Sequence, residues 1–149
     1  MNDKLRDLVR QWVAKAESDL TSAKRLLLFE EPTNDTICFH CQQATEKYLK
    51  AYLVSHQIEF PKIHNLAELV DMCYSKDRSF RHIQERAEIL TPFATVNRYP
   101  DDWYLPSANE TREALEIAEE IKAFVLQRIK IGEEAKESQT VNLNFNHSN

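Results

Sequence analysis

A strip of hydrogen-bonding side chains runs along one stretch of the sequence, FHCQQATEKYLKAYL at residues 39–53. The stretch has no Gly or Pro and is helical by composition, and at about 100° per residue its polar members share one side of the helix. The strip consists of His40, Gln43, Lys47 and Lys50. Their imidazole, amide and ammonium groups donate hydrogen bonds, so the strip can bind phosphate. A solvated helix face, with Glu46 paired to Lys50, explains the same pattern.

A second candidate site lies in RYPDDW at residues 98–103. Arg98 offers phosphate a fixed fork of donors, and the neighbouring Tyr99 offers a ring on which a base can stack. Prolines stiffen the surrounding loop, and long ordered loops often carry binding sites. A structural interpretation is also open, in which Arg98 pairs with Asp101 or Asp102. The sequence alone does not separate the two.

Other residues that can do chemistry have ordinary structural interpretations. His64 precedes a predicted helix, where anions are favoured, so it is a further candidate for phosphate binding, although the structural role of capping a turn is the favoured interpretation. Cys38 and Cys41 form a C-x-x-C inside a helix, without the strand and helix context of a redox motif. Cys73 and His64 would complete four metal ligands only by a coincidence of packing. We interpret the cysteines as small buried hydrophobes and predict no metal site and no cofactor.

Composition excludes several classes of protein. The chain of 149 residues contains one Gly, 42% hydrophobic and 29% charged residues, which is typical of a helix-rich globule of one domain. A formal net charge of -5 argues against binding nucleic acid through a general basic surface. Three cysteines make a disulfide framework improbable and indicate a reducing compartment. The charged N-terminus lacks a signal-peptide core, and no run approaches the roughly 18 apolar residues of a membrane span, so we predict a cytoplasmic protein.

Apolar periodicity and capping signals predict an all-α fold, an up-and-down bundle of four long helices plus one short helix. Asn65 with Glu68, and Ser107 with Glu110, have the spacing of helix N-caps, and Gly132 is suited to end the last helix. The sequence after it is polar and unpatterned. We therefore predict a helical domain over residues 1–131 and a flexible tail over 132–149. The expected helices cover residues 5–29, 35–56, 66–75, 79–90 and 107–131.

The helix expected over 35–56 has an unusually wide apolar arc, which extends past half of its circumference. Such a helix should sit at the centre of the bundle, with its polar strip beside a groove or an interface. The width of the arc also exceeds what one bundle contact needs. We therefore predict a homodimer.

Several motifs in order resemble the HEPN family, the nucleotide-binding helical domains of prokaryotes and higher eukaryotes. They are WVAKAESDLTSAKRLL, FHCQQATEKYLKAYL, FPKIHNLAEL and NRYPDDW, within residues 5–131. The resemblance implies a helical bundle, a homodimer and a separate minimal nucleotidyltransferase as partner, in a two-component or toxin–antitoxin system. The sequence itself lacks the Gly-rich phosphate loop and the paired carboxylates of a transferase, so transfer chemistry is expected to come from that partner.

Ribonuclease members of the family are similar in an Arg followed, after four to six residues, by a His. Arg98 matches the Arg of this pattern, but the positions for the His hold Trp103, Tyr104 and Leu105. None of these side chains titrates near neutrality as His does, so we predict no catalytic residue. The leading interpretation is a nucleotide-binding partner of a nucleotidyltransferase. The alternatives are a metal-independent ribonuclease with an unrecognised base and a non-catalytic protein-interaction module.

Overall fold

The computed structural model describes residues 1–95 and 104–129, and every regular element in these residues is helical. This confirms the predicted all-α fold. In chain order the elements are α1 (Asp3–Leu27), α2 (Asn34–Ser55), α3 (Leu66–Lys76), the 3-10 helix η1 (Arg78–Ile83), α4 (Gln84–Ile89), the 3-10 helix η2 (Thr91–Phe93) and α5 (Ala108–Arg128). None of these helices combines the length and the apolarity needed to cross a membrane.

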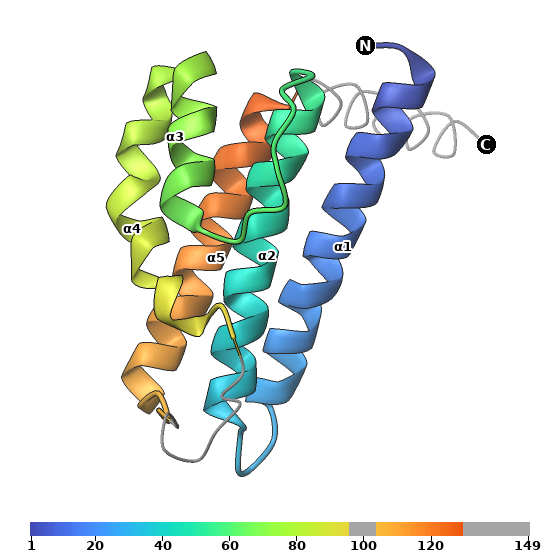
Figure 1. The fold of residues 1–149 in the computed structure, drawn as a ribbon. Coiled ribbons are helices and arrows are strands. Elements are labelled where there is room, and N and C mark those ends of the chain that lie inside the picture. Colours follow the sequence, from blue (N-terminus) through green and yellow to red (C-terminus); the bar gives the residue numbers. More distant parts are fainter. Residues whose placement is uncertain (96–103, 130–149) are drawn as a thin grey trace, which may run out of the picture.

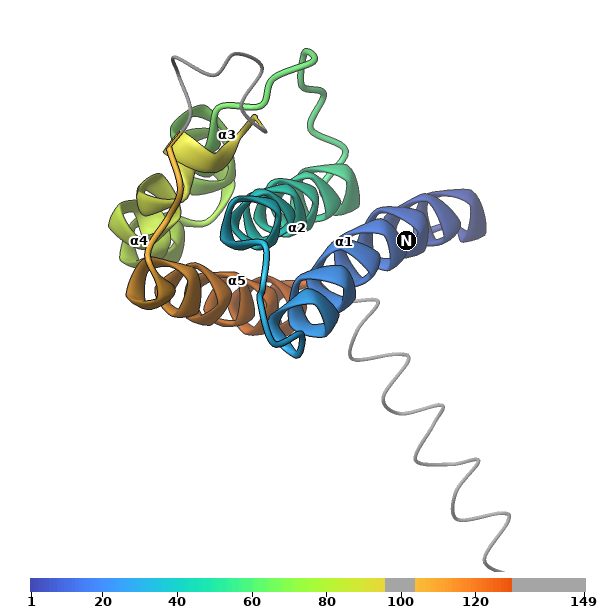
Figure 2. The ribbon, with the colours of Figure 1, turned by 90° about the horizontal axis from the view of Figure 1, so that it is seen from below.

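Helix α2 occupies the centre of the bundle, as the sequence predicts. It runs antiparallel to α1 and packs along it, and its other sides face α5 and α3 (Figures 1 and 2). Four apolar residues of α2 that are completely buried illustrate the wide arc, and they are Ile37, Ala44, Leu49 and Leu53. Because α1, α3 and α5 of one chain already cover this arc, α2 needs no second subunit to bury it. The homodimer stays a prediction.

Short-range signals fix the helix ends. The Asn65 side chain accepts a hydrogen bond from the Glu68 amide at 3.2 Å, which caps the start of α3. Ser107 and Glu110 form a complete capping box at the start of α5. These observations confirm both predicted N-caps. Helix α5 ends at Arg128, and the predicted cap Gly132 lies outside the described residues, as does the predicted tail 132–149.

The helix predicted over residues 79–90 is a composite. It begins as η1, a 3-10 helix, and continues as the six-residue helix α4. In a 3-10 helix residues three apart lie on the same side, and Phe80 and Ile83 use this spacing to bury both side chains. Asp77 caps η1 by accepting a hydrogen bond from the Ser79 amide at 2.9 Å, and the hydrogen bonds from Ser79 hold the pKa of Asp77 below its usual value. The fourth long helix is therefore two short elements.

Candidate functional site

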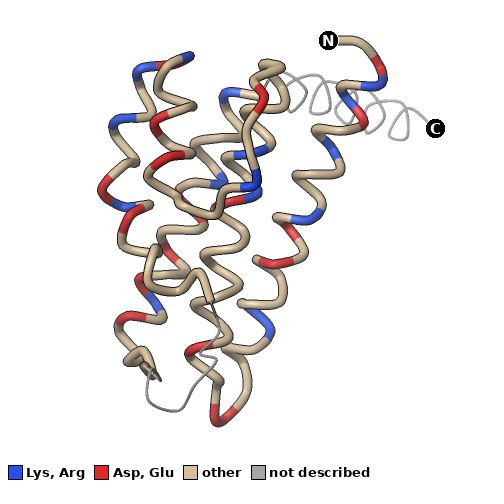
Figure 3. Tube along the Cα trace, in the orientation of Figure 1, with Lys and Arg blue, Asp and Glu red and all other residues tan. Residues whose placement is uncertain are grey.

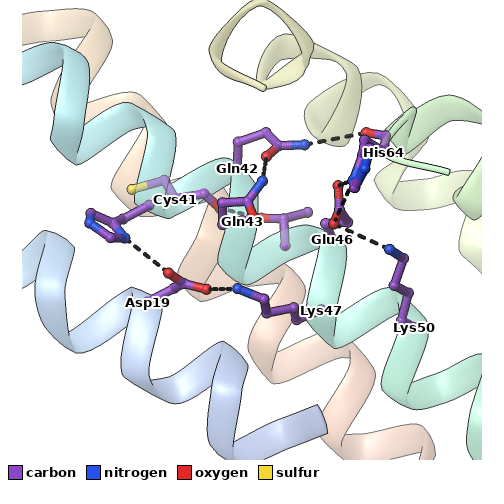
Figure 4. Close-up of polar contacts among 10 residues, drawn as sticks. Asp19, Cys41, Gln42, Gln43, Glu46, Lys47, Lys50 and His64 are labelled. Atoms are coloured by element: carbon purple, nitrogen blue, oxygen red, sulfur yellow. Dashed lines mark hydrogen bonds and ion pairs between the residues drawn. The ribbon is translucent and has the colours of Figure 1, made fainter. Parts of the chain in front are cut away.

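The polar strip of α2 does not face solvent alone, because two carboxylates lie against it. Figure 4 shows Asp19, from α1, beside one part of the strip and Glu46, from α2 itself, beside another. Each carboxylate pairs with one lysine and one histidine. The strip is therefore divided into two clusters, each built on one negative charge.

The Asp19 cluster joins α1 to α2 and consists of Asp19, His40 and Lys47. His40 Nδ1 lies 2.9 Å from Asp19 Oδ1, and the Lys47 ammonium donates to the other oxygen, Asp19 Oδ2. All three side chains are largely buried, with exposed fractions of 26% for His40, 14% for Asp19 and 22% for Lys47. If the imidazole is neutral, a carboxylate on Nδ1 selects the tautomer that carries its proton there and leaves Nε2 as the basic nitrogen. The cluster thus holds one imidazole in a fixed orientation.

The Glu46 cluster joins α2 to the connection before α3 and consists of Glu46, Lys50 and His64. His64 Nδ1 lies 3.1 Å from Glu46 Oε1, and Lys50 Nζ donates to Glu46 Oε2 at 3.3 Å. The Glu46 and Lys50 side chains are only 4% and 7% exposed, whereas His64 is 70% exposed. The interpretation of this pair as a solvated helix face is therefore wrong. A buried carboxylate needs such compensation, because an isolated buried charge is costly.

Two glutamines extend the Glu46 cluster along α2. Gln42 is completely buried and donates through Nε2 to the carbonyl oxygen of His64 at 3.4 Å. Gln43 is half-buried and donates through Nε2 to Gln42 Oε1 at 2.7 Å. The amides thus hold the backbone at His64 against the middle of α2, which fixes where its imidazole lies.

Aromatic rings enclose the Lys50 ammonium on a further side. Lys50 Nζ lies 5.7 Å from the ring centres of both Trp12 and Phe60, and the two rings meet edge to face with centres 6.1 Å apart. Attraction between a cation and the face of an aromatic ring stabilises this arrangement. Lys50 is thereby removed from solvent and serves the cluster rather than a ligand in solution.

A third polar contact joins the three longest helices. The Tyr48 hydroxyl of α2 donates to Glu17 Oε1 of α1 at 2.6 Å, and Lys122 Nζ of α5 donates to Glu17 Oε2 at 2.9 Å. Burial raises the pKa of Tyr48 well above its usual value, and the hydrogen bond to Glu17 raises it further. Tyr48 is therefore a neutral hydrogen-bond donor at every physiological pH.

The structure brings four of the six predicted site residues onto one side of α2. Gln43, Lys47 and Lys50 lie on the helix, and His64 folds back against it, but Lys47 and Lys50 are already paired with carboxylates. Arg98 and Tyr99 lie outside the described residues. Figure 3 shows acidic and basic positions mixed along α1, so this helix carries charges of both signs.

A second region with the features of a binding site lies between α4, η2 and the start of α5. It is a cavity of about 350 Å³, which we call the α4–α5 pocket, lined by Ile89, Pro92, Phe93, Tyr104, Glu110 and Glu113. The Tyr104 hydroxyl donates to Glu110, and this bond raises the pKa of Tyr104 and lowers that of Glu110. A concave apolar surface with a few polar groups in its wall is typical of binding sites.

Sequence reasoning missed the partners that complete these regions. Asp19 could have been noticed from the sequence, because this charged residue directly precedes Leu20, which lies on the buried side of α1. Trp12 and Phe60 carry none, since their meeting depends on how the connection after α2 folds back. The α4–α5 pocket also joins residues far apart in the chain, such as Ile89 and Glu113.

The cysteines lie in the core. Cys38, Cys41 and Cys73 are all free and completely buried, and burial raises the pKa of each thiol. This agrees with their interpretation as small buried hydrophobes. Within residues 1–95 and 104–129, no three His, Cys, Asp or Glu side chains are grouped so that they could hold a metal ion.

Comparisons with known proteins agree with this architecture. The HEPN domain model matches residues 9–130. The crystal structure of an archaeal HEPN homologue superimposes with a TM-score of 0.63 at 26% sequence identity, and the match covers 81% of this chain and 97% of the homologue. The curated proteins give no match. Because the family model spans α2, the connection to α3 and the RYPDDW segment together, the chain belongs to the HEPN domain family.

Proposed function

We propose that this HEPN protein binds a nucleotide or an RNA phosphate and acts as a homodimer, as the helical partner of a separate nucleotidyltransferase in a two-component or toxin–antitoxin system. The observation that carries the proposal is the family match over residues 9–130, which includes both stretches with phosphate-binding side chains. The protein supplies binding and position in this proposal, and the partner supplies transfer chemistry.

The geometry of the α2 strip supports phosphate binding by only some of its members. Lys47 and Gln43 remain partly exposed, and the exposed His64 lies beside them, so these three can donate to a phosphate oxygen. Lys50 is buried against Glu46, so its part is to hold that carboxylate and, through it, His64. From the sequence we add Arg98 as the main phosphate ligand and Tyr99 as the ring that stacks on the base.

Calorimetry with ATP, GTP, AMP and a short RNA tests the proposal. We expect Arg98→Ala to weaken binding by roughly tenfold or more, and Lys47→Ala by less, because removing a charge-assisted hydrogen bond has about this effect. Lys4→Ala, at an exposed lysine near the N-terminus, is the matched control. Absence of binding by the unaltered protein would favour the interaction-module alternative. Equal binding by the Arg98→Ala variant would make Arg98 a structural residue.

The two partner proposals have their own tests. A nucleotidyltransferase encoded beside this gene should co-purify with the protein when the two are expressed together. Light scattering at micromolar concentration should give the mass of two chains. A monomer in that measurement would remove the homodimer, and separate elution of the two proteins would remove the nucleotidyltransferase as partner.

A metal-independent ribonuclease is the second candidate, and the Asp19 cluster is the observation that favours it. An imidazole held through Nδ1 by a carboxylate is the arrangement of a general base, and His40 is held in this way by Asp19. We nevertheless expect no cleavage of a mixed RNA, because the His of the family pattern is replaced. Cleavage that disappears in both His40→Ala and Arg98→Ala would overturn this expectation and assign His40 as the base.

A further inference from the structure

The α4–α5 pocket is a candidate binding site for the base of a nucleotide. We propose that this pocket takes the base of the nucleotide and that it prefers guanine to adenine and either purine to a pyrimidine. The inference rests on the proposed nucleotide binding. It replaces stacking on Tyr99 with a separate site for the base, which lies apart from the α2 strip and contains none of the site residues predicted from the sequence.

The size and walls of the pocket suit one aromatic ring system. Its volume of about 350 Å³ lies near the lower end of ligand pockets, which suits a base rather than a whole nucleotide. Phe93 and Tyr104 supply aromatic walls, and Ile89 and Pro92 supply aliphatic ones. Ile89 and Tyr104 are 43% and 52% exposed, so apolar surface here remains in contact with water and would be buried by a flat ring.

The polar groups in the wall are hydrogen-bond acceptors. Both oxygens of Glu110 are engaged, one by the Tyr104 hydroxyl and one by the Ser107 amide. Glu113 differs, because Arg86 Nη1 donates to its Oε1 at 3.2 Å and no residue of the described chain donates to its Oε2. Arg86 itself is fixed by two hydrogen bonds to Glu120, and the fixed guanidinium in turn orients the Glu113 carboxylate. Among the residues that the structure describes, the pocket thus presents a positioned acceptor to which none of them donates.

This acceptor discriminates among bases by their donors. An ionised carboxylate accepts and cannot donate, so it favours a base edge that carries N–H groups. Guanine presents two adjacent donors, the ring N1–H and the amino group, while adenine presents one amino group. Cytosine also presents one amino group but has a smaller ring for the apolar walls. Uracil presents one N–H flanked by two carbonyl oxygens, which the carboxylate repels.

The same charges keep the phosphates out of the pocket. Glu110 and Glu113 line it, and Arg86, which pairs with Glu113, also pairs with Glu120, so two carboxylates share the one guanidinium and Glu110 adds a further negative charge. A phosphate would be repelled at this place, whereas the neutral base would not. A nucleotide is therefore expected to enter with its base first and its phosphates pointing away from these glutamates.

Calorimetry with GMP, AMP, CMP and UMP on the full chain tests the inference. We expect GMP to bind roughly tenfold tighter than UMP, since one or two hydrogen bonds to a charged group separate them. Ile89→Trp fills the pocket from its rim and should weaken GMP binding by roughly tenfold or more. Leu8→Trp, at an α1 position of nearly equal exposure, 44% against 43%, should leave it unchanged.

A second variant, which removes the charge of Glu113 without filling the pocket, tests base preference separately. Glu113→Gln should reduce the ratio of GMP to UMP affinity toward one, while Glu68→Gln, on α3, should preserve it. Equal affinity for the four nucleotides, with no effect of Ile89→Trp, would overturn the inference and leave the proposed function in place. Binding of none of the four, alongside binding of RNA by the same protein, would also overturn the inference alone. No binding of nucleotides or RNA would overturn both.

Discussion

The Glu46 cluster and the α4–α5 pocket use carboxylates in opposite ways. Glu46 is buried, and both of its oxygens lie within hydrogen-bond distance of donors from Lys50 or His64. Glu113 is half-exposed, and one of its oxygens receives no hydrogen bond from the described residues. A carboxylate whose partners are all internal stabilises the fold, whereas a positioned carboxylate with an open oxygen is suited to a ligand. Charged residues in a helical bundle therefore cannot be assigned to function by type alone.

The largest expected effect comes from breaking the Glu46 cluster. Glu46→Ala leaves the buried Lys50 ammonium without its counter-charge, and loss of one partner of a buried ion pair lowers the free energy of unfolding by about 3–5 kcal/mol. Urea denaturation measures this loss. Glu59→Ala, at an exposed position of the connection after α2, should change it by less than about 0.5 kcal/mol. A loss below about 1 kcal/mol in Glu46→Ala would show that the cluster does not stabilise the fold.

An intermediate effect is expected at the contact between α1, α2 and α5. Tyr48→Phe removes the hydroxyl that donates to Glu17 and should lower the free energy of unfolding by about 1.5 kcal/mol. Urea denaturation at neutral pH checks this value. An unchanged midpoint would mean that Lys122 alone satisfies Glu17.

Alkaline pH tests the same contact in another way. The pKa of Tyr48 is raised by burial and by Glu17, and burial raises that of Tyr52 to about 12. A raised pKa means that the folded state retains the proton more tightly than the unfolded chain. The resulting stability is complete below the unfolded pKa of about 10 and is lost as pH rises through the folded values. The urea concentration at the midpoint of unfolding should therefore decrease as the pH is raised above about 10, and it should decrease less steeply in Tyr48→Phe.

The smallest effect on stability is expected at the α4–α5 pocket. Ile89→Trp lies at an exposed rim and should change the free energy of unfolding by less than about 0.5 kcal/mol. Thermal unfolding provides the measurement. Together with lost GMP binding, this result would separate a ligand site from a structural contact. A large loss of stability would instead place Ile89 among the residues that hold the bundle together.

Local signals predicted the fold well. The sequence signals at Asn65 and Ser107 predicted helix starts that the structure shows, and the bounds of α1 and α2 differ from prediction by at most about two residues. The helix predicted over 79–90 begins as a 3-10 helix instead, and the sequence does not distinguish the two because Phe80 and Ile83, three apart, fit both. Only packing against neighbouring helices separates the two.

The site was less accessible to sequence reasoning. Periodicity placed Gln43, Lys47 and Lys50 on one side of α2 but gave no sign that Lys50 is buried, because its burial depends on Trp12 and Phe60 from other segments. Likewise, Arg86 donates to Oε1 of Glu113 while Oε2 receives no hydrogen bond from the described residues, and neither fact follows from the local pattern. Properties that arise from long-range juxtaposition are absent from local patterns.

The antiparallel contact between α1 and α2 has a consequence for the order of folding. The two helices are joined by the short turn between Leu27 and Asn34, so closing this hairpin loses little chain entropy, whereas α5 begins only at Ala108. We expect the hairpin to be formed in the transition state, with the hydrogen bond from Tyr48 to Glu17 in place. Helix α5 should dock afterwards, bringing Lys122 to the same carboxylate. The folding and unfolding rates of Ala16→Gly and Ala118→Gly, both at buried alanines, test this order. Ala16→Gly should slow folding, and Ala118→Gly should mainly speed unfolding. The reverse pattern would mean that α5 docks first.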